Sequence, residues 1–205
     1  SDDNFLEFNK KLIFTKYSMI GIRTPMLRDI AKKISKGDII SYLDSCDFIY
    51  YEEILLFGFI LSYIKDLDCF IKYFYKFIDC IDNWAVCDMC VASMKIIKKD
   101  KEFFLTHIKS LINSKEEYYV RVGIVILLDY YLDDMYIDQV FELIDSINRE
   151  EYYINMAIAW CISICFIKYR DKTLSYLNRC KLNKFTFNKT LQKIRESKRV
   201  SVEDK

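Results

Sequence analysis

The sequence contains only one proline and four glycines in 205 residues. Turn-rich β architectures depend on many such residues, so their scarcity excludes an all-β fold and favours an all-α one. Hydrophobic residues make up 52% of the chain and aromatic residues 16%, which excludes a disordered protein. Because the length suits one domain with a substantial core, we expect a single domain over residues 1–205.

Long apolar runs are also missing, since none reaches the ~18 residues that a membrane-spanning helix needs. The longest early candidate, Ile54–Ile64, is ended by Lys65 and Asp66. The sequence shows no secretory signal peptide either. We therefore expect a protein that does not engage a membrane and that works in the cytoplasm.

Histidine is nearly absent, with His107 alone, whereas there are eight cysteines. Cys87 and Cys90 form a C-x-x-C pair, but a zinc site would need a second pair or histidines. A redox pair would be expected in a βαβ context, which this chain lacks. We expect reduced thiols in the core, no metal and no organic cofactor.

The net charge is only +1, so no global field attracts nucleic acid and any basic surface must be local. One such surface is indicated at 181–199, where seven Lys or Arg accompany a single acid. Lys189 and Lys193 are four residues apart and would share a helix face. Arg195 and Arg199 form a second such pair. Both pairs are candidate contacts to phosphate groups, and the alternative is a solvated face that caps the end of the helical array.

Amphipathic segments of two kinds alternate along the chain. The strongly apolar kind comprises Tyr51–Tyr63, Trp84–Ile97, Tyr118–Leu132 and Tyr152–Tyr169. The half-polar kind comprises Leu67–Ile81, Lys101–Asn113, Met135–Asn148 and Lys172–Leu182. Because both kinds have helical periodicity, we expect pairs of helices.

These pairs recur with a period of about 34 residues. Aspartates that can cap the half-polar helices are spaced by 34, at Asp66, Asp100 and Asp134. The apolar helices begin with the same spacing, at Trp84, Tyr118 and Tyr152. A fixed period with two helices per unit is typical of a HEAT-like helical-repeat solenoid, an α-α superhelix with a concave groove. The alternative is a helical bundle with accidental spacing.

The repeat also aligns four side chains that carry chemistry. The offsets are counted from the equivalent helix starts Trp84, Tyr118 and Tyr152. Asp88 is at offset 4, Arg121 at offset 3 and Trp160 at offset 8. These offsets share one helical face, so we expect the four side chains to converge on one concave cleft. Arg121 lies in an apolar helix and needs an anionic partner, which is either a phosphate or a carboxylate, such as that of Asp88 in a structural ion pair.

The residues at these positions resemble a known family. The segments that carry the resemblance run almost end to end and are Gly21–Lys32, Tyr51–Glu53, Asp82–Asp88, Tyr119–Gly123, Met156–Trp160 and Asn188–Ser197. Their set and order are similar to the DNA alkylation repair family, typified by the HEAT-like 3-methyladenine and 7-methylguanine DNA glycosylases, and in particular to its shorter branch.

The resemblance implies a stack of helical repeats that holds duplex DNA with alkylated bases. It also implies excision of cationic N3- or N7-alkylpurines by a bacterial-type protein that is associated with the nucleoid when it acts. Because monomers are common among helical-repeat arrays, we expect a monomer. Carried over to this chain, Asp88 is the catalytic carboxylate, Trp84 and Trp160 are aromatic walls, and Arg121 binds phosphate.

Three functions remain open at this stage. The first is an alkylpurine DNA glycosylase, which the retained Trp84, Asp88 and Trp160 favour. The second is a non-catalytic binder of damaged or branched DNA on the same scaffold, and the third is a helical-repeat module that binds a protein. The near-neutral charge favours the second and third, because phosphate neutralisation supplies most non-specific DNA affinity.

Overall fold

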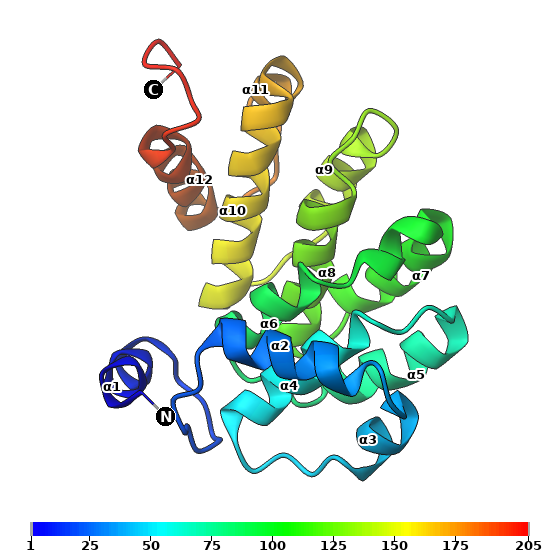
Figure 1. Ribbon diagram of the computed structural model, residues 1–205. Helices are drawn as coiled ribbons and strands as arrows, with labels where there is room; N and C mark the ends of the chain where they lie inside the picture. Colours follow the sequence, from blue (N-terminus) through cyan, green and yellow to red (C-terminus); the bar gives the residue numbers. More distant parts are fainter. Residues whose placement is uncertain (1, 205) are drawn as a thin grey trace. The chain divides into compact units, whose positions relative to one another are not determined.

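The computed structural model describes residues 2–204, which form helices and no β-strand (Figure 1). The single β-type contact among these residues is an isolated bridge between Ser18 and Tyr50. The expected all-α class is therefore confirmed. The helices are α1 (Asp3–Leu12), α2 (Thr24–Ile34), α3 (Ile39–Ser45), α4 (Tyr51–Leu61), α5 (Leu67–Ile78), α6 (Trp84–Val91), the 3₁₀-helix η1 (Lys95–Lys99), α7 (Lys101–Ile112), α8 (Glu117–Tyr130), α9 (Ile137–Asp145), α10 (Tyr152–Lys168), α11 (Arg170–Leu177) and α12 (Lys184–Glu196).

The helices pack into two compact units, residues 1–100 and 101–205. In the N-terminal unit, α4 packs against α2, α5 and α6. In the C-terminal unit, α10 packs between α8 and α12, and α7 and α11 pack on α8 and α10 respectively (Figure 1). The expectation of one domain over the whole chain stays a prediction.

The apolar helices are the centres of these units. In α4, residues such as Ile54, Phe57 and Ile60 are fully buried, and α8 and α10 bury side chains around most of their circumference in the same way. A helix that is hydrophobic all round is expected in a protein interior. The half-polar α5 instead buries one stripe, which includes Phe70, Phe74 and Phe77.

Hydrogen bonds between equivalent positions support the repeat of about 34 residues. Within the N-terminal unit, Lys99 Nζ donates to the Lys65 carbonyl across 34 positions. Within the C-terminal unit, the bonds that span 34 positions include Tyr136 to Glu102 (2.6 Å), Lys172 to Asp138 (2.7 Å) and Arg149 to the Lys115 carbonyl (2.8 Å). Consecutive repeats of a stacked array bring equivalent positions into contact in this way.

The expectation of one continuous helix after Asn83 was wrong. The segment Trp84–Ile97 is not one helix, because α6 ends at Val91 and the chain continues as the 3₁₀-helix Lys95–Lys99. The Ser93 hydroxyl donates to the Met89 carbonyl at this break, and the tighter turn still buries Ile96 and Ile97.

The aspartate caps were predicted partly correctly. Asp66 caps α5, since its side chain accepts the N–H of Cys69 at 2.8 Å. Before α9, however, the carboxylate of Asp133 and not that of Asp134 accepts the N–H groups of Met135 and Tyr136. The carboxylate of Asp133 thus holds the turn that precedes α9, which begins at Ile137, two residues later than expected.

None of the helices described for residues 2–204 is long and apolar enough to cross a membrane.

Candidate functional site

The side chains of Trp84 and Asp88 lie one turn apart on the short helix α6. Asn83 starts this helix, since its backbone is extended and its side-chain oxygen accepts the N–H of Val86 at 3.0 Å. The intervening Val86 and Cys87 are buried, whereas Trp84 is 37% exposed and Asp88 is half-buried. Helix α6 therefore presents an aromatic plane and a carboxylate on one accessible face.

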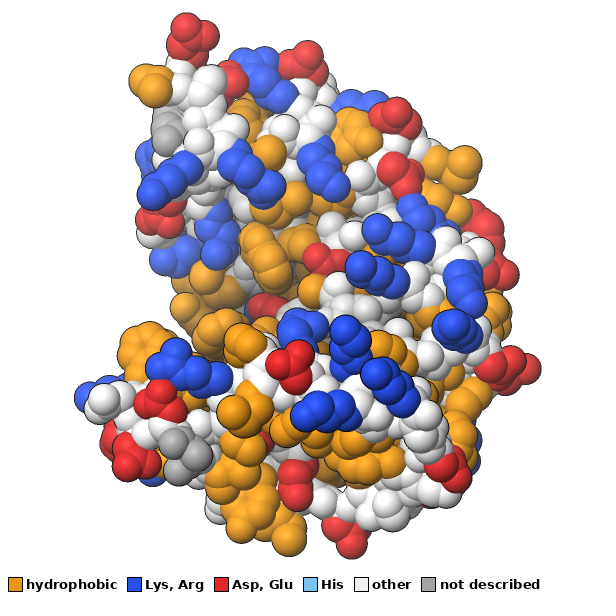
Figure 2. All heavy atoms as spheres, viewed as in Figure 1, with side chains coloured by type: hydrophobic (Ala, Val, Ile, Leu, Met, Phe, Trp, Pro, Cys, Tyr) orange, Lys and Arg blue, Asp and Glu red, His pale blue; other side chains and the backbone are white. Residues whose placement is uncertain are grey.

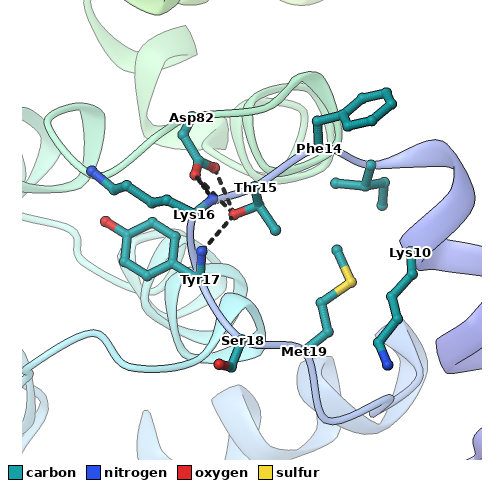
Figure 3. Close-up of a pocket in the computed structure, with 9 residues that line it drawn as sticks. Lys10, Phe14, Thr15, Lys16, Tyr17, Ser18, Met19 and Asp82 are labelled. Atoms are coloured by element: carbon teal, nitrogen blue, oxygen red, sulfur yellow. Dashed lines mark hydrogen bonds between the residues drawn. The ribbon is translucent and has the colours of Figure 1, made fainter.

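Asp82 ties the loop after α1 to the start of α6. Its two carboxylate oxygens accept the hydroxyl of Thr15 at 2.9 and 2.8 Å, and one of them accepts the N–H of Lys16 at 2.7 Å (Figure 3). The side-chain amide of Asn83 donates to the same carboxylate at 2.8 Å. The cap of α6 and the loop are thus held by one group.

Glu52 fixes the segment before α2. This buried side chain of α4 accepts N–H groups from Ile20, Gly21 and Ile22, with the shortest distance, 2.7 Å, to Gly21. Gly21 has a φ of 76°, a left-handed conformation that disfavours residues with a Cβ. Since Asp2 N–H donates to the Gly21 carbonyl, this segment in turn positions α1.

An apolar cavity of about 230 Å³ lies between α1 and Trp84. The side chains of Phe5, Phe8 and Leu12 from α1 form one side, and Tyr51, Trp84 and Met89 line it from α4 and α6. Phe8 and Leu12 are largely exposed, and Figure 2 shows hydrophobic side chains at the surface over α1. The cavity is suited to a planar or ring-shaped apolar group beside Trp84.

Sequence reasoning missed the contribution of α1 and the role of Glu52. The signal for α1 was the spacing of Phe5, Phe8 and Leu12, which share a helix face in a segment that buries no residue. The signal for Glu52 was an acidic residue at the start of an otherwise apolar helix, which needs donors to remain charged there.

Arg121 is built into the C-terminal unit. The residue is 5% exposed, and its Nη1 donates to the carbonyl of Tyr153 at 2.6 Å. Glu117, one turn earlier on α8, accepts the N–H of Tyr153 at 3.1 Å. Arg121 therefore joins α8 to the first turn of α10, and its proposed contact to phosphate stays a prediction. Trp160 lies further along α10 and is half-buried.

The basic C-terminal stretch forms α12 and a return segment. Lys189 and Lys193 are on the helix, where they share a face, and the Lys189 ammonium donates to Gln192 at 3.0 Å. Arg195 is exposed near the end of the helix. Figure 2 shows Lys and Arg side chains gathered over α12.

The expected pairing of Arg195 with Arg199 on one helix face was wrong. Helix α12 ends at Glu196, and Ser197 is extended, so Arg199 is not part of the helix. The physical reason is the burial of Val200, which folds back to pack with Phe166 and Ile194. Arg199 is exposed, and its contact to DNA stays a prediction.

The candidate residues thus fall into two groups. Trp84 and Asp88 are brought together in the N-terminal unit, and the C-terminal unit holds Arg121, Trp160 and the basic residues of its last helix. Convergence of the two groups on one cleft stays a prediction.

Half of the cysteines belong to the core packing, whereas Cys46, Cys69, Cys80 and Cys180 are half-buried. Cys87 and Cys90 are buried, and the thiol of Cys90 donates to the Leu55 carbonyl at 3.6 Å. Burial raises the pKa of Cys90 well above its usual value, so the group is a neutral thiol. No group of three or more potential metal ligands occurs within residues 2–204.

Comparison with known protein families shows to which family the chain belongs. The family model described as DNA alkylation repair enzyme matches residues 2–200. This chain belongs to that family. No curated protein matches it. Among solved structures, it is similar to AlkD2 from Streptococcus mutans, with 13% sequence identity and a TM-score of 0.67 over 95% of this chain and 97% of that one. At this identity the likeness shows a shared helical-repeat fold, and the family shows a role in DNA repair.

Proposed function

We propose that this protein is a DNA glycosylase that excises cationic N3- or N7-alkylpurines from duplex DNA. The observation that carries the proposal is the pair of Trp84 and Asp88 on one accessible face of α6, beside an apolar cavity lined by aromatic rings. Membership of the DNA alkylation repair family supplies DNA as the partner. The protein works as a cytoplasmic monomer that associates with the nucleoid when it acts.

The chemistry requires little more than these groups. An alkylated purine already carries a positive charge, so it leaves without a general acid. The deoxyribose then gains oxocarbenium character, as in glycoside hydrolysis. A fixed carboxylate at Asp88 stabilises this cation and orients the attacking water. The indole of Trp84 holds the sugar and favours the cation through its negative face.

The remaining candidate residues position the DNA. Trp160 acts as the second aromatic wall, and Arg121 contacts a phosphate. The cations of α12 bind the backbone without reading sequence. No cofactor is involved.

The proposal is tested by incubating the purified protein with N-methylated duplex DNA and measuring released 7-methylguanine and 3-methyladenine. Release above the spontaneous rate supports the proposal. Absence of release, with DNA binding intact, contradicts the glycosylase and favours the second candidate.

That second candidate is a non-catalytic binder of damaged or branched DNA. The near-neutral net charge of +1 favours it. The salt dependence of DNA binding separates both candidates from a module that binds a protein partner, since only a DNA binder shows a steep slope.

A further inference from the structure

A basic surface of the N-terminal unit lies outside the residues assigned so far. Residues 1–100 contain 14 Lys or Arg and 15 Asp or Glu, so this unit has no excess of cations. Half of its cations nevertheless fall in two short segments, 28–36 and 95–99, in which Asp29 is the only acid. Figure 2 shows Lys and Arg side chains gathered over α2, which carries most of the first segment.

Arg28 links this surface to the candidate site. Its Nη1 donates to the hydroxyl of Ser93 at 2.8 Å, and its Nη2 donates to the Met89 carbonyl at 3.4 Å. The guanidinium lies over the ring of Phe59, 4.1 Å from the ring centroid. Ser93 lies just before η1, which carries the second basic segment, and Met89 directly follows Asp88. The basic surface therefore adjoins the half of α6 that carries the candidate carboxylate.

From Arg28 the cations continue along α2 at a regular spacing. Lys32 follows Arg28 by one turn, and Lys36 follows Lys32 by another, because Ser35 keeps a right-handed helical conformation past the end of α2. Four residues advance a helix by about 6 Å, so the charges recur at that interval. All three cations are exposed. Within residues 2–204, the ammonium groups of Lys32, Lys36 and Lys95 make no hydrogen bond or ion pair.

The folding of this unit does not account for the cluster. Like charges one turn apart on a helix repel each other. The partial negative charge at the end of α2 offsets this repulsion at Lys32, but Lys95 begins η1, where the helix dipole disfavours a cation. A polyanion with regularly spaced charges would relieve the repulsion. The phosphates of a DNA strand are spaced in this way, whereas a peptide carries its carboxylates on flexible side chains.

We propose that Arg28, Lys32 and Lys36, with Lys95 beside them, bind successive phosphates of one strand of duplex DNA. The assignment rests on the proposed function, since it takes DNA as the partner. It gives the N-terminal unit a contact to the backbone of its own, next to α6, in addition to the contact assigned to α12. Because phosphate contacts position a duplex without reading its sequence, these cations determine the affinity and not the chemical step.

The first measurement is the salt dependence of binding by Lys32→Gln/Lys36→Gln. The duplexes are unmodified DNA and DNA with a tetrahydrofuran abasic site, which cannot lose a base. The variant should bind both more weakly, and its slope of log affinity against log salt should flatten by about 2, one for each lost phosphate contact. At saturating protein, it should release 7-methylguanine from methylated DNA at the wild-type rate.

The matched control is Lys11→Gln/Lys16→Gln. It removes two exposed ammonium groups of the same unit, from α1 and the loop that follows, and changes the net charge equally. Its salt slope should be that of the wild type. Equal melting temperatures of both double variants and the wild type show that the fold is intact.

The second measurement locates the contacted phosphates. Four duplexes each carry neutral methylphosphonates in one strand, on one side of the abasic site. On one of the four, the wild type and Lys32→Gln/Lys36→Gln should bind equally, because the phosphates that the two lysines contact are already neutral. On the other three, the variant should bind more weakly than the wild type.

An unchanged salt slope in the folded variant, or an equal change in the control, overturns the assignment and leaves α2 with a solvated basic face. The assignment is also wrong if the variant is weaker on all four modified duplexes by the same factor. If the wild type releases no base while the variant still loses affinity, the glycosylase is contradicted and the surface stands. Failure of the wild type to bind any DNA overturns both.

Discussion

The carboxylate of Glu52 accepts the backbone N–H of Gly21 at 2.7 Å, from a loop that lies 31 residues earlier in the sequence. The same side chain accepts the N–H groups of Ile20 and Ile22. Through this contact α4 holds the loop, the loop holds α1, and α1 forms one side of the cavity next to Trp84. The shape of the candidate site therefore depends on a residue that lies outside it.

Replacing Glu52 with alanine should destabilise the protein by roughly 1–3 kcal/mol, because backbone donors lose their buried acceptor. Urea unfolding measures the effect. Glu52→Gln keeps one acceptor oxygen, so its stability should lie between that of the wild type and that of Glu52→Ala. The exposed Glu150→Ala serves as the control and should stay within about 0.5 kcal/mol of the wild type. An equally small effect at Glu52 would show that the loop does not depend on this carboxylate.

Gly21→Ala should be destabilising by about 1 kcal/mol or more. The position has a φ of 76°, and an added Cβ would lie 3.0 Å from Leu6 Cβ and 3.1 Å from the Asp2 carbonyl. Gly37→Ala is the matched control, since its added Cβ meets only the Ile34 carbonyl, at 3.6 Å. Thermal unfolding of both variants measures the difference. Similar melting temperatures for the two would contradict the strain at Gly21.

The sequence was sufficient to predict features that depend on the spacing of side chains within one helix. Three of the four apolar helices and the pairing of Trp84 with Asp88 follow from spacing alone. The anchors could not be predicted, because Glu52 and Asp82 bind segments 30 to 67 residues away. The end of α12 was missed for a similar reason, since burial of Val200 depends on a tertiary contact with Phe166.

The only histidine, His107, offers a direct test of the local packing. It lies 4.9 Å from the ring of Phe103, and burial lowers its pKa below the usual 6.5. Below that pH the unfolded chain binds more protons than the folded one, so stability falls as the pH drops through this range. The ring proton signals in NMR give the pKa directly. His107→Gln should show less loss of stability between neutral and acidic pH, and an unshifted titration would contradict the burial.

Reversing both lysines in Lys189→Glu/Lys193→Glu should weaken binding to all DNA sequences alike. The slope of affinity against salt should flatten by about 1 for each phosphate that the variant no longer binds. The double variant Lys109→Glu/Lys115→Glu changes the net charge equally at exposed positions elsewhere in the C-terminal unit. If both double variants show the same decrease in affinity, α12 is only a solvated basic cap.

The central claim is that Asp88 stabilises the cationic transition state of base excision. The most direct measurement is the single-turnover rate of 7-methylguanine release at saturating protein, for the wild type and Asp88→Asn. The account predicts a decrease of roughly 100- to 1000-fold in rate with DNA affinity unchanged. Asp68→Asn, an exposed carboxylate on α5, should keep the wild-type rate. Equal excision rates for Asp88→Asn and the wild type would contradict the account.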